Sequence, residues 1–309
     1  MLPPLLHQAK SAFRRTPFGK VPEVAFLFKK NSMRVCVLLM LVVAGPAAAQ
    51  SYSLIETPLR RFTLEASYGF AAPSARSSSA VAGTNFSLEA TLGAKRFLDS
   101  RHSSLLVDVA YPHAIASYTG AISRPPDTTT QTTTLSLIKI GLGIKDGVGY
   151  KLEQAAVTPT LTSAWLLTVP SFGRLLASPD EQSKLERFNG LRFGVSSAAG
   201  LNIQLASSFA VDFSYEQTLV FPRVVFLQFL GAQALQMGMQ IGAGYFIDAV
   251  FGGAPSLLPI AHTVLKSAIN FTLYALRRDR QFFPFESESP LLVNTLKLGV
   301  AFYIGKIYE

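Results

Sequence analysis

The feature that most constrains this fold is an alternation of apolar residues with a period of two, which recurs along most of the chain after residue 58. In 62–70 (FTLEASYGF), apolar or aromatic side chains occupy every second position, and Thr, Glu, Ser and Gly lie between them. Successive side chains of a β-strand point to opposite faces, so the pattern predicts a strand with one apolar and one polar face. It recurs in 85–95, 105–111, 138–145, 157–169, 191–204, 209–219 and 295–309. We therefore predict eight strands, most of them near the roughly 9–11 residues with which a tilted strand crosses a bilayer.

The polar faces of these strands carry charges of both signs in equal number. An eight-stranded barrel has an interior just wide enough for side chains to fill. Charges buried there can pair with one another, whereas charges of a single sign would be very costly. We therefore expect a charge network in the lumen of a transmembrane β-barrel. Its members would be Glu65, Glu89, Asp108, Asp212 and Glu216, with Lys95, Lys139, Lys145, Arg192 and Lys297.

The lengths of the connections alternate as well. Long polar segments follow the first, third and fifth strands (71–84, 119–131 and 170–190), whereas 98–102 and 205–208 are short and 146–153 is intermediate. Short turns at one end and long loops at the other are typical of outer-membrane barrels. A soluble sandwich has no comparable reason to sort its loops by parity.

The N-terminal 49 residues differ from the rest in charge and pattern. They hold seven of the 28 Lys/Arg and one of the 19 Asp/Glu, so the remainder has a net charge of only about +3 and nucleic acid is not indicated as a partner. Residues 33–49 (MRVCVLLMLVVAGPAAA) have the basic start, apolar core and small-residue end of a secretory signal peptide. We expect cleavage near Ala49–Gln50 and interpret 1–32 as an over-extension of the start. Cys36, the only cysteine, lies in the signal's apolar core and predicts neither a disulfide nor a lipid anchor.

Segment 222–290 breaks the alternation of the strands. Its first half is strongly apolar, Gly-Gly-Ala-Pro then follows at 252–255, and its second half has apolar residues at helical spacing before Arg277, Arg278 and Arg280. We predict an inserted helical hairpin on the loop side of the barrel. The alternative is two further strands, which would make a ten-stranded barrel.

With these features the chain resembles the small outer-membrane β-barrel proteins of Gram-negative bacteria, of OmpA/OmpX-like architecture, over 58–221 and 291–308. Such barrels carry a C-terminal assembly signal of the form polar-x-Gly-x-x-aromatic-x-hydrophobic. Lys297, Gly299, Phe302 and Ile304 match it, although the chain ends Tyr308-Glu309 rather than on an aromatic residue. The resemblance implies the outer membrane as location, with outer-membrane lipid and the assembly machinery as partners.

Residues suited to catalysis or to metal binding are sparse. No G-x-S-x-G motif, paired histidines or Asp-rich loop occurs, and beyond the signal only His102, His113 and His262 remain. We therefore expect no enzyme activity, no catalytic residues, no cofactor and no metal. The leading hypothesis is a structural or interaction barrel with a closed lumen, whose loops and segment 222–290 contact a protein partner. The alternatives are a barrel that transports a small or apolar solute and a lipid-modifying enzyme.

Overall fold

The computed structural model describes residues 59–75, 85–100, 103–121, 135–152, 155–173 and 179–304. Its strands are β1 (Leu59–Ala75), β2 (Asn85–Ser100), β3 (Ser103–Ala121), β4 (Leu135–Leu152), β5 (Ala155–Phe172), β6 (Arg192–Ala206), β7 (Phe209–Val220) and β8 (Leu291–Ile304). Its helices are α2 (Pro179–Glu186), α3 (Phe226–Phe251), the short 3-10 helix η2 (Pro255–Leu257) and α4 (Leu258–Arg277). The expected extension 1–32 and signal peptide 33–49 lie outside the described residues.

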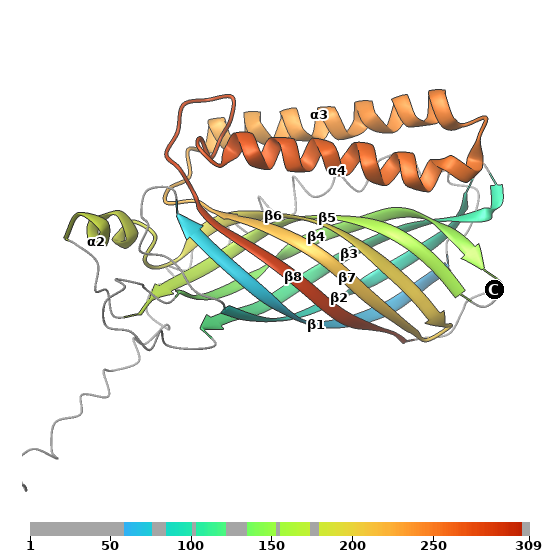
Figure 1. Cartoon of the computed structure of the whole chain (residues 1–309), viewed down its shortest axis with the longest axis horizontal. Coiled ribbons are helices and arrows are strands. Elements are labelled where there is room, and N and C mark those ends of the chain that lie inside the picture. Colours follow the sequence, from blue (N-terminus) through green and yellow to red (C-terminus); the bar gives the residue numbers. More distant parts are fainter. Residues whose placement is uncertain are drawn as a thin grey trace, which may run out of the picture. The chain divides into compact units, whose positions relative to one another are not determined.

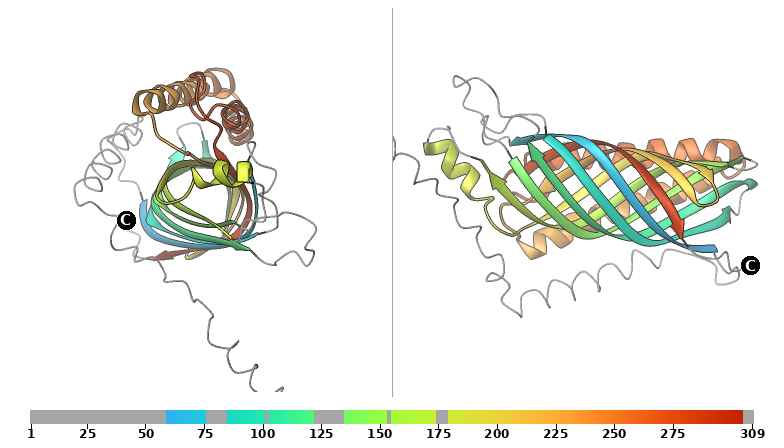
Figure 2. Two further views of the ribbon diagram at one scale, coloured as in Figure 1. Left: turned by 90° about the vertical axis from the view of Figure 1, so that its left-hand side faces the viewer. Right: turned by 90° about the horizontal axis from the view of Figure 1, so that it is seen from below.

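The eight strands form one closed antiparallel barrel (Figures 1 and 2). Each strand pairs with its neighbours in sequence, and β8 closes the ring on β1 from Phe62↔Ile304 to Ala75↔Leu291. This confirms the prediction of an eight-stranded antiparallel barrel with a helical insertion before the last strand. Within the described residues 179–304, segment 222–290 adds no strand, so the ten-stranded alternative is wrong.

The two ends of the barrel differ in their connections. The strand ends joined by 76–84, 122–134, 173–191 and 221–290 define what we call the loop end, and those joined by 101–102, 153–154 and 207–208 define the turn end. The predicted alternation of long and short links is therefore confirmed. The predicted link 146–153 is wrong in its bounds, because its residues up to Leu152 belong to β4. The strands have 12 to 19 residues, and most are thus longer than the strands predicted from the alternation of apolar residues.

Alternation gives each strand an inner and an outer side. Exposed large apolar side chains line the outer side of β1, β2, β4, β7 and β8, among them Phe62, Phe70, Leu88, Ile140 and Leu298. The inner sides carry buried polar and charged side chains, from Thr63 and Glu65 on β1 to Lys297 on β8. The fold is thus apolar on its outer wall and polar over much of its interior.

The expected faces of β3 need correction. Tyr111 and His113 lie inside, where the Tyr111 hydroxyl contacts β1 and β2, and the alternation then places Asp108 on the outer side. The first half of β3 has apolar residues on both faces, so the apolar pattern does not decide which face points inward. The inward face is instead set by Tyr111 and His113, whose polar atoms form hydrogen bonds inside the barrel. Asp108 therefore does not belong with the lumen charges.

Helices α3 and α4 form an antiparallel hairpin that lies along the outside of the barrel wall (Figures 1 and 2). It leaves and rejoins the barrel at the loop end, but its tip reaches the turn end, where the Tyr150 hydroxyl of β4 donates a hydrogen bond to the Ser256 carbonyl (2.6 Å). The expectation that the hairpin stays on the loop side is therefore wrong. None of the helices in the described part of the chain combines the length and the apolar character needed to cross a membrane.

Two apolar clusters attach the hairpin to the wall. At the loop end, Phe229 of α3 packs against Trp165 of β5 and Phe193 of β6. Phe282, which follows α4, packs on Phe229 and on Phe221, which follows β7. Near the turn end, Ile247 and Leu258 pack on Leu106 of β3. The hairpin is therefore held at both ends, which fixes its long axis beside that of the barrel.

Candidate functional site

The barrel interior is the candidate site, and it is layered from the loop end to the turn end. At the loop end lies a mainly apolar layer that contains Leu185 and Phe188, from the β5–β6 connection, both with 0% exposure. The strands contribute inward side chains to it, namely Ala71, Ala75, Leu135, Leu137, Val220, Leu291 and Val293. Helix α2, which carries Leu185, lies over this mouth of the barrel in the end-on view of Figure 2. The loop end is thus closed by packed apolar side chains.

Below this layer, two lysines and two glutamates from four different strands form an ion-pair cluster. Lys297 contacts Glu89 at 2.6 Å and Glu216 at 2.5 Å. Lys139 also pairs with Glu216, and its Nζ lies 3.9 Å from Glu89. The four side chains are at most 9% exposed. Because each carboxylate faces both ammonium groups, the cluster is electrically balanced, which is the condition for burying charge.

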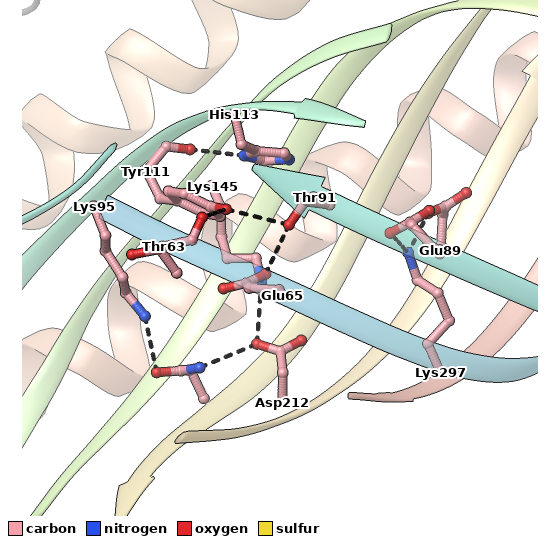
Figure 3. A network of polar contacts seen from close by, with 12 residues as sticks. Thr63, Glu65, Glu89, Thr91, Lys95, Tyr111, His113, Lys145, Asp212 and Lys297 are labelled. Atoms are coloured by element: carbon pink, nitrogen blue, oxygen red, sulfur yellow. Dashed lines mark hydrogen bonds and ion pairs between the residues drawn. The ribbon is translucent and has the colours of Figure 1, made fainter. Parts of the chain in front are cut away.

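A second cluster, centred on Lys145 of β4, lies next to the first (Figure 3). Its Nζ donates to Glu65 at 2.7 Å and to Asp212 at 3.1 Å, so one ammonium bridges β1 and β7 across the lumen. Thr91 donates a further hydrogen bond to Glu65 (3.4 Å) and lies 3.2 Å from the Tyr111 hydroxyl. The Lys145 contacts thus link non-adjacent strands across the lumen, whereas Thr91 contacts the neighbouring strands β1 and β3.

Lys95 lies nearer the turn end and has a different environment. Its Nζ donates to Asn202 Oδ1 (3.0 Å) and to the Tyr303 hydroxyl (2.9 Å), and it lies 5.0 Å from the Tyr303 ring centroid. Asn202 in turn donates to Asp212 (3.3 Å), which links Lys95 to the Lys145 cluster through one amide. Lys95 is therefore satisfied by neutral acceptors and an aromatic face rather than by direct contact with a carboxylate.

His113 packs in a slot formed by two glycines. The strand register places Gly93 and Gly143 on either side of it, and a Cβ built on Gly143 would lie only 2.9 Å from the His113 ring. The ring stacks on Tyr111 with centroids 4.6 Å apart, and its Nδ1 lies 2.8 Å from the Tyr111 carbonyl oxygen. A small cavity of about 40 Å³ lies among His113, Lys145 and Glu216, which is room for roughly three water molecules.

Of the ten predicted lumen charges, eight lie together in the interior: Glu65, Glu89, Lys95, Lys139, Lys145, Asp212, Glu216 and Lys297. Asp108 lies on the outer side of β3. Arg192 begins β6 in the inward phase at the loop end, and its Nε has no hydrogen-bond partner among the described residues. The contributions of Tyr111 and Tyr303 hydroxyls were not evident from the sequence, because a tyrosine fits either face of a membrane strand.

In the described residues, the charged side chains of the barrel interior mainly contact one another. No group of three or more His, Cys, Asp or Glu side chains is placed there to hold a metal ion. His262 lies in α4, 4.0 Å from Asp146, and His102 lies outside the described residues. The lumen carboxylates are engaged with lysines, so the arrangement neutralises and fills the interior.

Comparison with known proteins gives little beyond the fold. No protein-family model matches the chain, and no curated protein matches it. Among solved structures it is similar to Neisserial surface protein A, with 12% identity and a TM-score of 0.37 over 79% of this chain and 97% of that one. A likeness this weak says nothing about function, so the geometry of the chain itself has to carry the proposals.

Proposed function

We propose that this chain is an outer-membrane β-barrel protein of a Gram-negative bacterium, with a structural or interaction role, a closed charge-paired lumen and no catalytic activity. The observation that carries the proposal is the contrast between the two sides of one closed sheet. The outer side exposes large apolar residues such as Phe70 (53%) and Leu298 (60%), while the inner side buries four lysines with four carboxylates. This distribution suits hydrocarbon outside and no solvent column inside.

The layered interior supports a closed lumen rather than a transport path. A solute would have to displace the apolar layer around Phe188 and then separate the buried ion pairs of Lys139, Lys145 and Lys297. Breaking one such pair costs on the order of 3–5 kcal/mol, which is too much for passive diffusion of a small solute through all of them. The lumen thus serves to hold the wall together.

Export and assembly complete the proposal. Residues 33–49 would direct secretion with cleavage near Ala49–Gln50, and Lys297, Gly299, Phe302 and Ile304 of β8 would be read by the outer-membrane assembly machinery. Phe302 and Ile304 are exposed on the outer side of β8, which suits recognition during insertion, whereas Lys297 is turned inward.

The test combines fractionation of cells that express the full chain with gel migration and planar-bilayer recordings of the purified protein. We expect heat-modifiable migration on gels, with the protein in the outer-membrane fraction, and no conductance in planar bilayers under conditions in which a known porin conducts. Recovery as a soluble periplasmic protein would contradict the membrane location. A stable conductance step would instead favour the transport barrel and overturn the closed lumen.

A further inference from the structure

The α3–α4 hairpin is inverted relative to a helix pair on the surface of a soluble protein. In such a protein the polar residues face water and the apolar stripe faces the core. Here all four glutamines of α3 (Gln228, Gln233, Gln236 and Gln240) are buried or half-buried. The exposed large side chains of the hairpin are apolar or aromatic: Phe226, Leu227, Leu235, Met239, Ile241, Tyr245, Phe246, Val250, Leu257, Ile260, Val264 and Leu276. We call these twelve the outer face of the hairpin.

The polar side chains of the hairpin form an internal seam between the two helices. Gln240 donates to Asn270 at 2.7 Å, and Gln236 donates to the same oxygen at 3.4 Å. Arg277, only 4% exposed, donates to Gln236 (2.8 Å) and to the Ala232 carbonyl (2.6 Å). The polar groups therefore satisfy one another instead of facing outward.

The barrel wall continues this seam. Lys266 of α4 donates to Asp146 (3.3 Å), which occupies an outer position of β4. Ser163, Ser197 and Gln217 of β5, β6 and β7 line a cavity of about 40 Å³ together with the hairpin residues Gln233, Gln236, Asn270 and Arg277. These polar outer positions of β4–β7 thus lie against the hairpin, whereas the exposed large side chains on the outer side of β1, β2 and β8 are apolar or aromatic.

Charges are distributed along the hairpin as they are along a membrane segment. No charged residue occurs from Val224 to Ile247, and charges gather at Arg277–Arg280 at the loop end and at Asp248 near the tip. The exception is Lys266 in the middle of α4, which pairs with Asp146 of the barrel wall. Helix α3 has 26 residues, a length of about 39 Å at 1.5 Å per residue, against about 30 Å for the hydrocarbon core. Neither helix is apolar enough to cross a membrane by itself, because each has polar side chains, and these face the other helix or the barrel wall. The hairpin also runs along the long axis of the barrel (Figure 1).

We propose that the outer face of the hairpin is a lipid-facing surface, embedded in the hydrocarbon layer beside the barrel, with its polar seam sealed against β4–β7. The proposal rests on the proposed membrane location of the barrel. Hydrocarbon tails fit this face because it offers no charge and almost no hydrogen-bonding group, and because it continues the apolar outer wall of the barrel. In water, so large an apolar face would be unfavourable.

The experiment compares oxygen and a nickel chelate as collision partners of single spin labels in phospholipid vesicles. In a Cys36→Ala background, labels are placed at Met239→Cys and Val264→Cys on the hairpin. Leu88→Cys and Ile140→Cys on the bare barrel wall are matched lipid-facing controls, and Arg280→Cys beyond α4 is the aqueous control. Because apolar oxygen concentrates in the hydrocarbon core, we expect the hairpin labels to match the wall labels within about twofold and to exclude nickel.

Each other outcome is decisive. Hairpin labels that behave like Arg280→Cys, while the wall labels are lipid-like, would overturn the lipid-facing hairpin and leave the membrane barrel intact. Aqueous behaviour at every position would overturn the membrane location as well. Exclusion of both probes at Met239 and Val264 would show that the outer face is covered by protein, either a second copy of this chain or another partner. That result would overturn lipid as the occupant of the face.

A label-free measurement uses tryptophan, because Trp165 is the only one in the chain and lies under the hairpin. In a Trp165→Phe background, Leu235→Trp and Val264→Trp should be quenched by brominated lipids as strongly as Leu88→Trp on the wall. The unaltered chain should be quenched at least about twofold less, since Phe229 packs over Trp165. Equal quenching of Trp165 and weak quenching of the two hairpin positions would contradict the proposal.

Discussion

At the scale of single residues, Lys145 is the most consequential side chain of the lumen. Its ammonium is the direct partner of both Glu65 and Asp212, and the side chain is 9% exposed. Lys145→Met would leave two carboxylates buried without that cation, and we expect a loss of about 3–5 kcal/mol in the free energy of unfolding. Urea titration followed by the heat-dependent gel shift measures it. Lys184→Met, which breaks the exposed Lys184–Asp180 pair of α2, is the matched control and should cost at most about 0.5 kcal/mol.

Lys95 should respond differently although it is equally buried. Its direct partners are Asn202 and Tyr303, which also contact each other at 3.4 Å, so removal of the ammonium leaves no carboxylate that it contacts directly. Methionine has a similar length and suits the apolar contact with Phe97. We expect Lys95→Met to cost roughly 1 kcal/mol, well below Lys145→Met, in the same titration. A loss as large as that of Lys145→Met would mean that Lys95 neutralises Glu65 at longer range.

Most of the lumen charges could be predicted from the sequence because the strands that carry them, apart from β3, alternate clearly. Glu65, Asp212 and Lys297 each sit among small or polar residues, opposite a face of large apolar ones. The same reasoning fails for strand β3, because it has apolar residues on both faces: Leu106 on the outer face, and Val107 and Val109 on the inner face. The sequence pattern therefore assigns Asp108 to the inward face, although it lies on the outer one. The pairing of each lysine with its carboxylate depends on the register of the strands around the barrel, which the alternation of apolar residues does not predict.

At the scale of elements, the β5–β6 connection closes the loop end of the barrel. Leu185 and Phe188 are fully buried against inward residues of β1, β4, β7 and β8. We expect Leu185→Ala with Phe188→Ala to lose several kcal/mol of stability, at about 2–5 for each truncated side chain. Planar-bilayer recordings should still show no conductance, because the ion-pair clusters below remain. Conductance in this variant, at unchanged fold, would assign the seal to the apolar layer alone.

The hairpin shows the limit of what its own sequence could predict. Helical spacing in α4, the glycine-proline break before η2 and the terminal arginines indicated two helices. They did not indicate where the helices lie, because that depends on polar outer residues elsewhere in the chain. Asp146 and Gln217 interrupt otherwise apolar outer faces of β4 and β7. They mark the strip of wall that the polar side of the hairpin, with the glutamines of α3, covers.

At the scale of the whole molecule, barrel and hairpin should be separable, because β7 and β8 pair directly from Phe209↔Phe302 to Val220↔Leu291 without help from the helices. A variant in which a flexible Gly/Ser linker replaces 226–277 should therefore still close and keep its heat-modifiable migration. At the proposed membrane location it should be less stable than the full chain, because the removal of α4 would expose Asp146 and Gln217 to lipid.

The substitution Asp146→Leu tests whether the hairpin shields the barrel wall, because its effect on stability should have opposite signs with and without the hairpin. In the full chain, Asp146→Leu removes the partner of Lys266, whose side chain is 16% exposed, and should lower the free energy of unfolding by about 1 kcal/mol or more. In the variant without the hairpin, the same carboxylate faces lipid, and its replacement by leucine should raise stability by roughly 1–2 kcal/mol. Urea titration of the four proteins in vesicles gives both differences. The same sign in both backgrounds would mean that the hairpin does not shield this strip of wall from the bilayer.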